Sequence, residues 1–239
     1  MFCGICLFYK AFLVCSSNVY RVVIIMRFSS VISTSFLYLS VLAAPMAQAN
    51  YDTLFIDAAS GEAIEHYRLG YGETSRGEVG DVVTSMLYVG YYRSDDIAKI
   101  EDTNIGETEV EVLSIGSGGF GYIEGHHQNG GAEFDFELSQ TRVEALDYDR
   151  TAIGFRTQVF LPVVAGLQLN LGFNLRPFFL ASDWDDQAEL EYEYQGGLEY
   201  AFNLDAAIYT HYRTMKVIDE DENDVTLAED VVLGLRFRF

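Results

Sequence analysis

The chain has no cysteine after residue 15 and no acidic residue among its first 49. Its three cysteines are Cys3, Cys6 and Cys15. The part from Asn50 onward therefore has no disulfide, no thiolate metal site and no cysteine nucleophile. That part also has no apolar run approaching the ~20 residues of a membrane-spanning helix.

Positive charge is scarce beyond this compositional boundary. Of 15 Lys and Arg residues only Lys10, Arg21 and Arg27 precede Asn50, whereas all 36 Asp and Glu residues follow it, so residues 50–239 carry a formal charge of -24. Nucleic acid binding requires cationic side chains for the phosphates. The excess of negative charge over residues 50–239 therefore argues against nucleic acid as a partner.

Residues 26–49 have the pattern of a secretory signal peptide. The stretch MRFSSVISTSFLYLSVLAAPMAQA opens with Arg27, continues through an apolar stretch at about residues 31–44 and ends in the small residues of Ala47-Gln48-Ala49. Signal peptidase cleaves after such a pattern. We therefore expect cleavage between Ala49 and Asn50.

Residues 1–25 precede this complete signal, which begins with its own methionine. We interpret them as an upstream extension from a start codon assigned too early. A membrane anchor is the alternative, but charged and polar residues from Lys10 to Arg21 interrupt the apolar run. Length then suggests a single domain over residues 50–239.

Period-two alternation is the main pattern of this domain. In AELEYEYQGGLEYAF, residues 188–202, Leu190, Tyr192 and Tyr194 share one face of a strand while Glu191 and Glu193 share the other. We expect ten strands, of which the first is least certain, at residues 51–58, 63–72, 82–93, 108–122, 132–146, 151–161, 167–179, 188–202, 204–217 and 226–239. Residues 132–146 change phase, which predicts a β-bulge near Ser139.

The lengths and faces of these strands favour a membrane barrel. Many have ten or more residues, the length of a tilted transmembrane strand, and aromatic residues lie near their ends. Only a closed sheet leaves no unpaired edge in lipid. The fold class we expect is all-β, a closed antiparallel transmembrane up-and-down β-barrel of about ten strands, with eight as the alternative. A soluble periplasmic β-protein, with the apolar face inside, is the structural rival.

The last segment, VVLGLRFRF, places apolar residues on one face and Arg236 and Arg238 on the other. It resembles the C-terminal assembly signature of Gram-negative outer-membrane barrels. The residues assigned to this signal are Leu233, Leu235, Phe237 and Phe239. The barrel-assembly machinery, outer-membrane lipid and lipopolysaccharide are the partners this implies.

The inferred inner face carries charges of both signs. It includes Arg68, Arg142, Arg156, Arg176, Arg213, Arg236 and Arg238, together with Glu137, Glu189, Glu191, Glu193, Glu199, Asp205 and His211. Opposite charges in a narrow lumen pair, because an unpaired buried charge costs several kcal/mol. A barrel of about this size is filled by side chains, so we expect a salt-bridged interior in preference to a wide pore.

Strand order places the acidic connections on one side. With both termini in the periplasm, the outward loops are residues 94–107, 147–150, 181–187 and 218–225, and the periplasmic ones are 72–81, 124–131, 161–166 and 202–205. In the last outward loop, Asp219, Asp221 and Asn223 follow the first positions of a calcium loop, but the sixth position has no glycine and no helices flank it. A solvated hairpin is the favoured interpretation, with divalent cation binding as the alternative.

The four histidines give no catalytic signature. His126 and His127 are adjacent in a polar turn, whereas His66 and His211 share the inferred lumen face. No serine lies in a G-x-S-x-G elbow. We therefore expect no enzyme and no cofactor, with a lipid-modifying barrel as the alternative to test at His66 and His211.

The second half resembles the YfaZ-type outer-membrane proteins. The similarity rests on AIGFRTQVFLP, LQLNLGFNLRPFFLASDW, EYEYQGGLEYAFNLDAAIYTHYRTMKV and DVTLAEDVVLGLRFRF, over about residues 147–239, and more loosely on residues 87–115. The acidic segment at about 97–109 and the turn at residues 126–127 depart from it. The resemblance implies a small outer-membrane barrel and no mapped reaction. From the signal peptide, the alternation and the terminal Phe239 we expect a role in envelope structure or as a narrow conduit for small solutes.

Overall fold

The computed structural model describes residues 12–16, 19–23, 50–76, 81–100, 103–123, 130–143, 146, 148–182, 188–203, 205–219 and 223–239. The chain divides into two compact units, Met1–Ala47 and Gln48–Phe239. The predicted signal peptide and Ala49 lie outside the described residues, and Asn50 is exposed at the start of the second unit.

The first unit contains one antiparallel strand pair, β1 (Phe12–Ser16) with β2 (Val19–Val23), in which Phe12 lies opposite Val23. The sequence did not predict strands in this segment. No described helix is long and apolar enough to cross a membrane.

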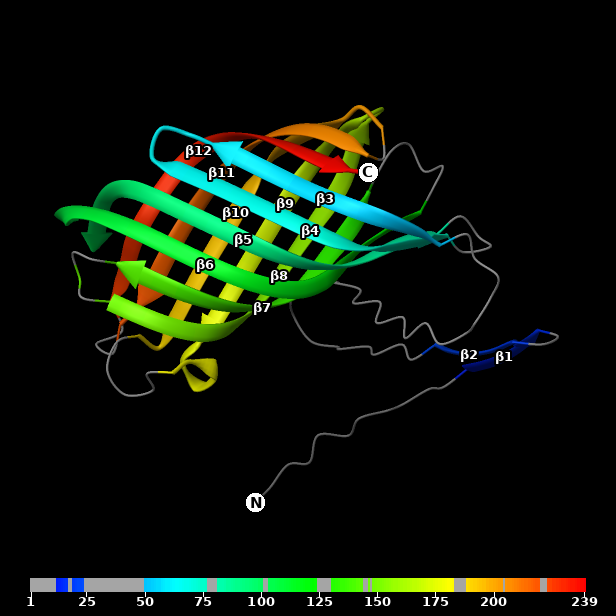
Figure 1. Cartoon of the computed structure of the whole chain (residues 1–239), viewed down its shortest axis with the longest axis horizontal. Helices are drawn as coiled ribbons and strands as arrows, with labels where there is room; N and C mark the ends of the chain where they lie inside the picture. The colour runs from blue at the N-terminus through cyan, green and yellow to red at the C-terminus, as the bar shows by residue number, and fades with distance from the viewer. Residues whose placement is uncertain are drawn as a thin grey trace, which may run out of the picture. The chain divides into compact units, whose positions relative to one another are not determined.

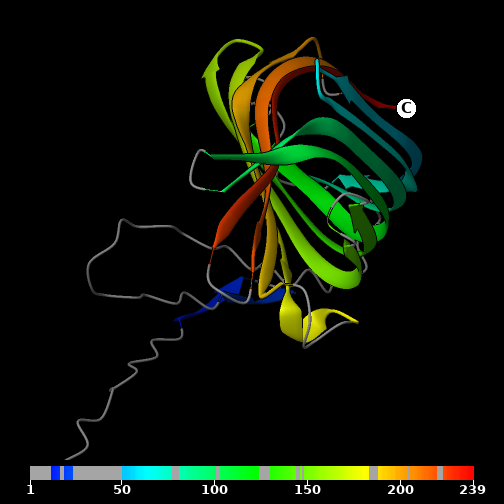
Figure 2. The same ribbon diagram turned by 90° about the vertical axis from the view of Figure 1, so that its left-hand side faces the viewer.

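The second unit is a closed, ten-stranded antiparallel barrel, as expected (Figures 1 and 2). Its strands are β3 (Tyr51–Ser60), β4 (Ile64–Arg76), β5 (Asp81–Ile100), β6 (Thr103–Ile123), β7 (Gly131–Val143), β8 (Tyr148–Val164), β9 (Leu167–Pro177), β10 (Leu190–Ala201), β11 (Ala206–Ile218) and β12 (Asp224–Arg238). A short 3-10 helix, η2 (Phe178–Leu180), follows β9. Each strand pairs with the next, and β12 pairs with β3 from Leu233 opposite Ser60 to Arg238 opposite Phe55, which closes the ring.

The two ends of the barrel differ. Tyr51 and Phe239 lie at one end, called here the terminal end, where the Leu54 and Phe239 backbones exchange two hydrogen bonds of 2.9 Å. The opposite end, called the hairpin end, carries the β3–β4 turn and the β5–β6 hairpin. Figure 1 shows β5 and β6 extending past the β3–β4 turn at this end.

Beyond that turn, β5 pairs directly with β12. Lys99 lies opposite Thr226 and Ile100 opposite Val225, so the ladder passes over the ends of β3 and β4. This short ladder is an additional pairing within the ring of ten strands. The barrel therefore has ten strands, as expected, and the alternative of eight is wrong.

Two sequence predictions are wrong at this level of detail. Residues 94–107 were expected to form an outward loop, but β5 continues to Ile100 and β6 starts at Thr103. β7 keeps one phase throughout, without a bulge at Ser139 in either of its ladders. Val143 therefore faces the interior.

The interior has three layers along the barrel. An apolar cluster near the terminal end contains Val82, Phe120, Tyr122 and Phe160. A larger cluster near the hairpin end includes Ile64, Val110, Met215 and Leu227 among its buried members. Between these two apolar layers lies a layer rich in ionised side chains. The barrel is thus filled with protein along its length.

Candidate functional site

The ionised middle layer of the barrel is the main chemical feature of the molecule. It contains seven buried carboxylates, Asp57, Glu133, Asp135, Glu137, Glu191, Glu193 and Glu199. The arginines of the interior are Arg68, Arg150, Arg176, Arg213 and Arg236, all buried, and Arg156, whose side chain is 11% exposed. Alternation places them there, because odd and even positions of a strand face opposite sides of the sheet.

Arg176 on β9 is the centre of one ion-pair network. Its guanidinium donates to Glu137 Oε1 at 2.6 Å and to Glu191 Oε1 at 2.6 Å, and it also pairs with Glu193 at 2.8 Å. Asn174 donates a further hydrogen bond to Glu137 at 2.7 Å. This network ties β7, β9 and β10 together through the lumen.

A second network crosses the barrel. Arg68 on β4 donates to Glu133 on β7 at 2.6 Å and to Asp57 on β3 at 3.0 Å. Arg236 on β12 shares Asp57 at 3.3 Å and bonds Glu199 on β10 at 3.0 Å. Because β4 and β7 are separated by two strands, the bond from Arg68 to Glu133 crosses the lumen.

Most of the predicted lumen charges lie in the interior, but three do not. Arg142 is half-exposed outside the barrel and pairs with Asp149 at 3.3 Å, because β7 has no phase change. Glu189 and Asp205 are exposed in the connections before β10 and before β11. Arg238, by contrast, lies on the inner side as predicted but is only half-buried, with its guanidinium 3.9 Å from the centre of the Phe120 ring.

Four interior charges were not assigned from the sequence. Asp57, Glu133 and Asp135 follow the same period-two pattern as their neighbours, so counting back by twos from Glu137 finds the last two. Arg150 was placed in an outward loop, but it is 1% exposed on the inner face of β8. Its Nε and Nη2 have no hydrogen-bond partner, and its Nη1 donates to the Tyr148 hydroxyl at 3.3 Å.

The described interior includes two small cavities. The central one has about 10 Å³ open to the centre of a water molecule and includes His66, His211, Arg156 and Arg213 in its lining. The other, near the terminal end, has about 20 Å³ and is lined in part by Gln168, Glu199 and Arg238. One water needs roughly 10–15 Å³ of such space. Neither cavity holds more than one or two waters.

His66 and His211 lie in the interior, as predicted, and both line the central cavity. No serine, threonine or cysteine is among the residues that line it. The space is far too small for a lipid. The described geometry therefore gives no support to a lipid-modifying reaction at these histidines, and His126 and His127 lie outside the described residues.

The calcium-like segment begins between β11 and β12, where Asp219 and Asn223 are described. Asp219 accepts hydrogen bonds from the Asn223 backbone N–H at 2.8 Å and from Asn223 Nδ2 at 2.9 Å. Asp221 lies outside the described residues. Among the described residues no group of three or more His, Cys, Asp or Glu side chains is placed to hold a metal.

The β5–β12 junction is a site that the sequence did not reveal. Lys99 Nζ pairs with Glu229 Oε1, and the Tyr212 hydroxyl donates to Glu229 Oε2 at 2.7 Å. Asp96 Oδ2 accepts the Glu229 backbone N–H at 3.0 Å. These four residues, called here the clasp, fasten the β5–β6 hairpin to β11 and β12.

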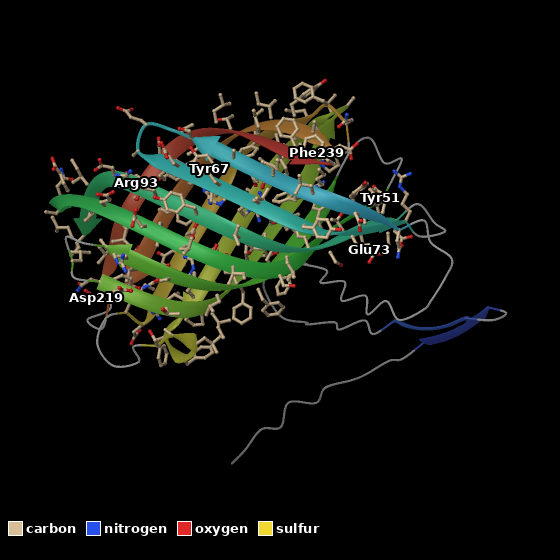
Figure 3. The ribbon with its side chains drawn as sticks, viewed as in Figure 1. Tyr51, Tyr67, Glu73, Arg93, Asp219 and Phe239 are labelled. Atoms are coloured by element: carbon tan, nitrogen blue, oxygen red, sulfur yellow. The ribbon has the colours of Figure 1, made fainter. Side chains whose placement is uncertain are left out.

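The outer wall is apolar between two charged borders. On β4, Tyr67, Leu69 and Tyr71 point outward and are 43%, 51% and 60% exposed, and the outward positions Glu65 and Glu73 lie on either side of them. Figure 3 shows Tyr67 on the wall between Arg93 at the hairpin end and Glu73 at the terminal end. An apolar outer face recurs on β12, where Val231, Leu233 and Leu235 are exposed and Phe237 is half-buried, and Phe239 after the strand is exposed as well.

Tyrosine hydroxyls mark the border at the hairpin end. Tyr91 donates to Glu111 at 3.2 Å, Tyr192 to Asp224 at 3.1 Å, and Tyr212 to Glu229. In each case the ring lies on the outer wall and the hydroxyl bonds a carboxylate of another strand, which is the adjacent strand for Tyr91 and Tyr212 and the next but one for Tyr192. At the terminal end, Tyr51, Tyr200, Phe202 and Phe239 are exposed aromatics, and Figure 3 shows Tyr51 and Phe239 toward this end.

Comparison with known proteins gives structural similarity alone. No family model and no curated protein matches the chain. OmpT of Vibrio cholerae with loop L8 deleted, an outer membrane protein, is 12% identical with a TM-score of 0.35, over 77% of this chain and 62% of that one, so this chain spans about three fifths of its length. The NanC porin is 10% identical with a TM-score of 0.34, over 78% and 99% of the two chains. The β domain of the Bordetella autotransporter BrkA is 13% identical with a TM-score of 0.31, over 81% and 100%. At these values the similarities carry no conclusion about function.

Proposed function

We propose that the protein is an integral outer-membrane β-barrel of the Gram-negative envelope, with a filled interior and a structural role. The observation that carries the proposal is the inversion of the closed sheet, with charged side chains inside and large apolar side chains outside. Leu69, Leu87 and Leu113 on the outer wall are 51%, 66% and 62% exposed, while Arg68 and Arg176 are 3% and 1% exposed. In water such a wall is unfavourable, since each exposed leucine forgoes about 1.5–3 kcal/mol of burial. In lipid it is the favourable arrangement.

Aromatic residues at both borders of this wall support the same proposal. Tyrosine rings suit the membrane interface because the ring is apolar and the hydroxyl bonds polar groups. Tyr91 and Tyr192 have this arrangement at the hairpin end. We call the wall between the two borders the apolar band. On β5 it ends before Arg93, and on β12 it begins at Val231, so Lys99 and Glu229 lie outside it.

The test of location is fractionation of a Gram-negative host that expresses residues 26–239 with the predicted signal. We expect the protein in the outer membrane, with a mobility on gels that changes when the sample is boiled. Recovery of soluble protein from the periplasm, with no boiling-dependent shift, contradicts the proposal. The same sample, sequenced from its N-terminus, tests cleavage between Ala49 and Asn50.

Of the two roles expected from the sequence, the geometry favours the structural one over the solute conduit. Arg68 reaches from β4 to Glu133 on β7, Arg176 links β9 to β7 and β10, and each of the two cavities described holds only one or two waters. In planar lipid bilayers we therefore expect no discrete conductance steps from the purified barrel. Regular steps that depend on protein concentration and persist after further purification contradict the filled interior.

The partners of the barrel follow from this proposal. Outer-membrane lipid covers the apolar band, lipopolysaccharide adjoins the acidic hairpin end, and the assembly machinery recognises Leu233, Leu235, Phe237 and Phe239. Membership of the YfaZ-type family stays a prediction alongside these. A divalent-cation role at Asp219, Asp221 and Asn223 also stays a prediction, which calorimetry with calcium tests.

A further inference from the structure

The central cavity is lined mainly by cations and hydrogen-bond donors. Arg156 on β8, Arg213 on β11, His66 on β4 and His211 on β11 all contribute to the lining. Arg68 and Arg236 also line it, and Asp57 is its one carboxylate. That carboxylate is already occupied, because it accepts hydrogen bonds from Arg68, Arg236 and Tyr209.

Of the four arginines that line the cavity, Arg156 and Arg213 have the longest ion pairs. Arg156 is 3.4 Å from Glu137, and Arg213 is 3.5 Å from Glu193. Neither guanidinium makes a closer polar contact within the described part of the chain. By contrast, Arg176 has three carboxylate partners at 2.6–2.8 Å. A guanidinium has five N–H donors, so both side chains retain donors for the cavity.

The two imidazoles add to this surplus of donors. His66 Nδ1 and His211 Nε2 are buried and have no hydrogen-bond partner among the described residues. A neutral imidazole carries its proton on either nitrogen, so each of these atoms becomes a donor in one tautomer. Gln158 Oε1 is an unpartnered acceptor in the same lining. Donors and positive charge still exceed acceptors and negative charge around this space.

We propose that the cavity binds one small monovalent anion of the size of chloride, held between Arg156 and Arg213 with His66 and His211 beside it. Buried cations are stabilised when charge-assisted hydrogen bonds satisfy their donors. The space holds one particle of about the size of a water molecule, which admits a monatomic anion and excludes polyatomic anions such as sulfate. The net positive lining disfavours a metal cation. The site depends on the barrel interior and not on where the barrel resides, so its failure and that of the outer-membrane proposal are distinguishable.

The first test uses the wild-type barrel in detergent micelles. Its unfolding temperature is measured at constant ionic strength while gluconate is replaced by chloride or bromide. A ligand that binds only the folded state raises this temperature in a saturable manner. We expect such a rise with both halides and not with sulfate. Crystals grown in bromide are expected to show an anomalous peak in the cavity. An unfolding temperature that is the same in every salt, with no peak there, overturns the proposal and leaves a single water in the cavity.

Two matched variants locate the effect. Arg213→Gln removes one of the two under-paired cations, and we expect it to raise the halide concentration at half-effect by about tenfold or more. Arg93→Gln is the control, because Arg93 is half-exposed on the outer wall and pairs with Glu109 there. An unchanged halide response in Arg213→Gln contradicts the site. Should Arg213→Gln fail to fold, the bromide peak of the wild-type crystals decides the question.

Discussion

Lys99 on β5 and Glu229 on β12 form an ion pair across the hairpin end of the barrel, although 130 positions separate them in the chain. Their contact is possible only because β3 and β4 stop at Ser60 and Ile64, below the level of the pair. Asp230 Oδ2 accepts the backbone N–H groups of Ala63 and Ile64 at 2.8 and 3.1 Å, which fixes the β3–β4 turn under β12. Glu229 of the clasp and Asp230, which holds the β3–β4 turn, are adjacent residues of β12.

We expect the contribution of Glu229 to stability to depend on pH. Hydrogen bonds from Lys99 and Tyr212 hold the pKa of Glu229 below its usual range. A group with a lowered folded-state pKa stabilises the fold above its unfolded pKa, about 4.3, and loses that contribution as pH falls through the folded value. Glu229→Gln should therefore lower the unfolding temperature at neutral pH, and the difference from wild type should shrink in acid. Lys99→Met should show the same trend, and a pH-independent difference for both variants contradicts the assignment.

Arg176→Met tests the ion pairs of the lumen. The variant leaves Glu191 buried without its cation and Glu137 with only the longer pair to Arg156, which costs roughly 3–5 kcal/mol of unfolding free energy. Arg142→Met is the matched control, because Arg142 is on the outer wall with one exposed ion pair worth up to about 1 kcal/mol. The temperature at which the boiling-dependent gel shift occurs measures both. Equal losses in the two variants contradict the interior network.

Gly116→Ala tests the packing of the lumen wall. A Cβ at Gly116 would lie 2.3 Å from Cζ of Tyr88, so the ring must move, and such overpacking costs about 1–3 kcal/mol. Gly121→Ala on the same strand is the control, because a Cβ there meets no atom within 4 Å. Urea unfolding of the two variants in micelles should differ in midpoint by that amount. A Gly116→Ala variant with the same urea midpoint as wild type contradicts the position of the Tyr88 ring against Gly116.

Leu87→Arg separates a lipid-facing wall from a water-facing one. Leu87 lies within the apolar band, where an arginine costs roughly 2–4 kcal/mol in a bilayer. Ile97→Arg is the control on the same strand, outside the band, where the cost is about 0–1 kcal/mol. Folding yield and unfolding free energy in lipid vesicles measure the difference. Two equally neutral variants indicate that water covers both positions.

Much of this architecture is predictable from the sequence because a strand has only two faces. Once Leu190, Tyr192 and Tyr194 are assigned to the outer face, Glu191 and Glu193 must face inward, and the structure confirms both. The same counting places Asn174 and Arg176 in the lumen. It fails where a strand ends, since Glu189 and Asp205 have the inward phase but lie in connections and not in strands.

The β5–β6 extension shows what alternation does not reveal. Residues 94–107 combine Asp, Asn, Gly and Glu, which are uncommon in strands, so the sequence favours a loop. The structure makes them a hairpin because β12 supplies a pairing partner beyond the end of β4. That partner is set by the lengths of β3 and β4, which no local pattern specifies. The clasp residues therefore have no signal of their own in the sequence.

Pairing of β5 with β12 also restricts how the wall can part. The seam between the first and last strands, β3 and β12, is where an up-and-down barrel opens sideways. Here the β3–β12 ladder ends at Ser60, and β12 is then joined to β5 across the top of the seam. Because β12 stays paired with β5 at the hairpin end, β3 and β12 can separate only from the terminal end, where Tyr51 and Phe239 lie. A molecule leaving the lumen through this seam would have to pass toward the terminal end, and the hairpin end would stay shut.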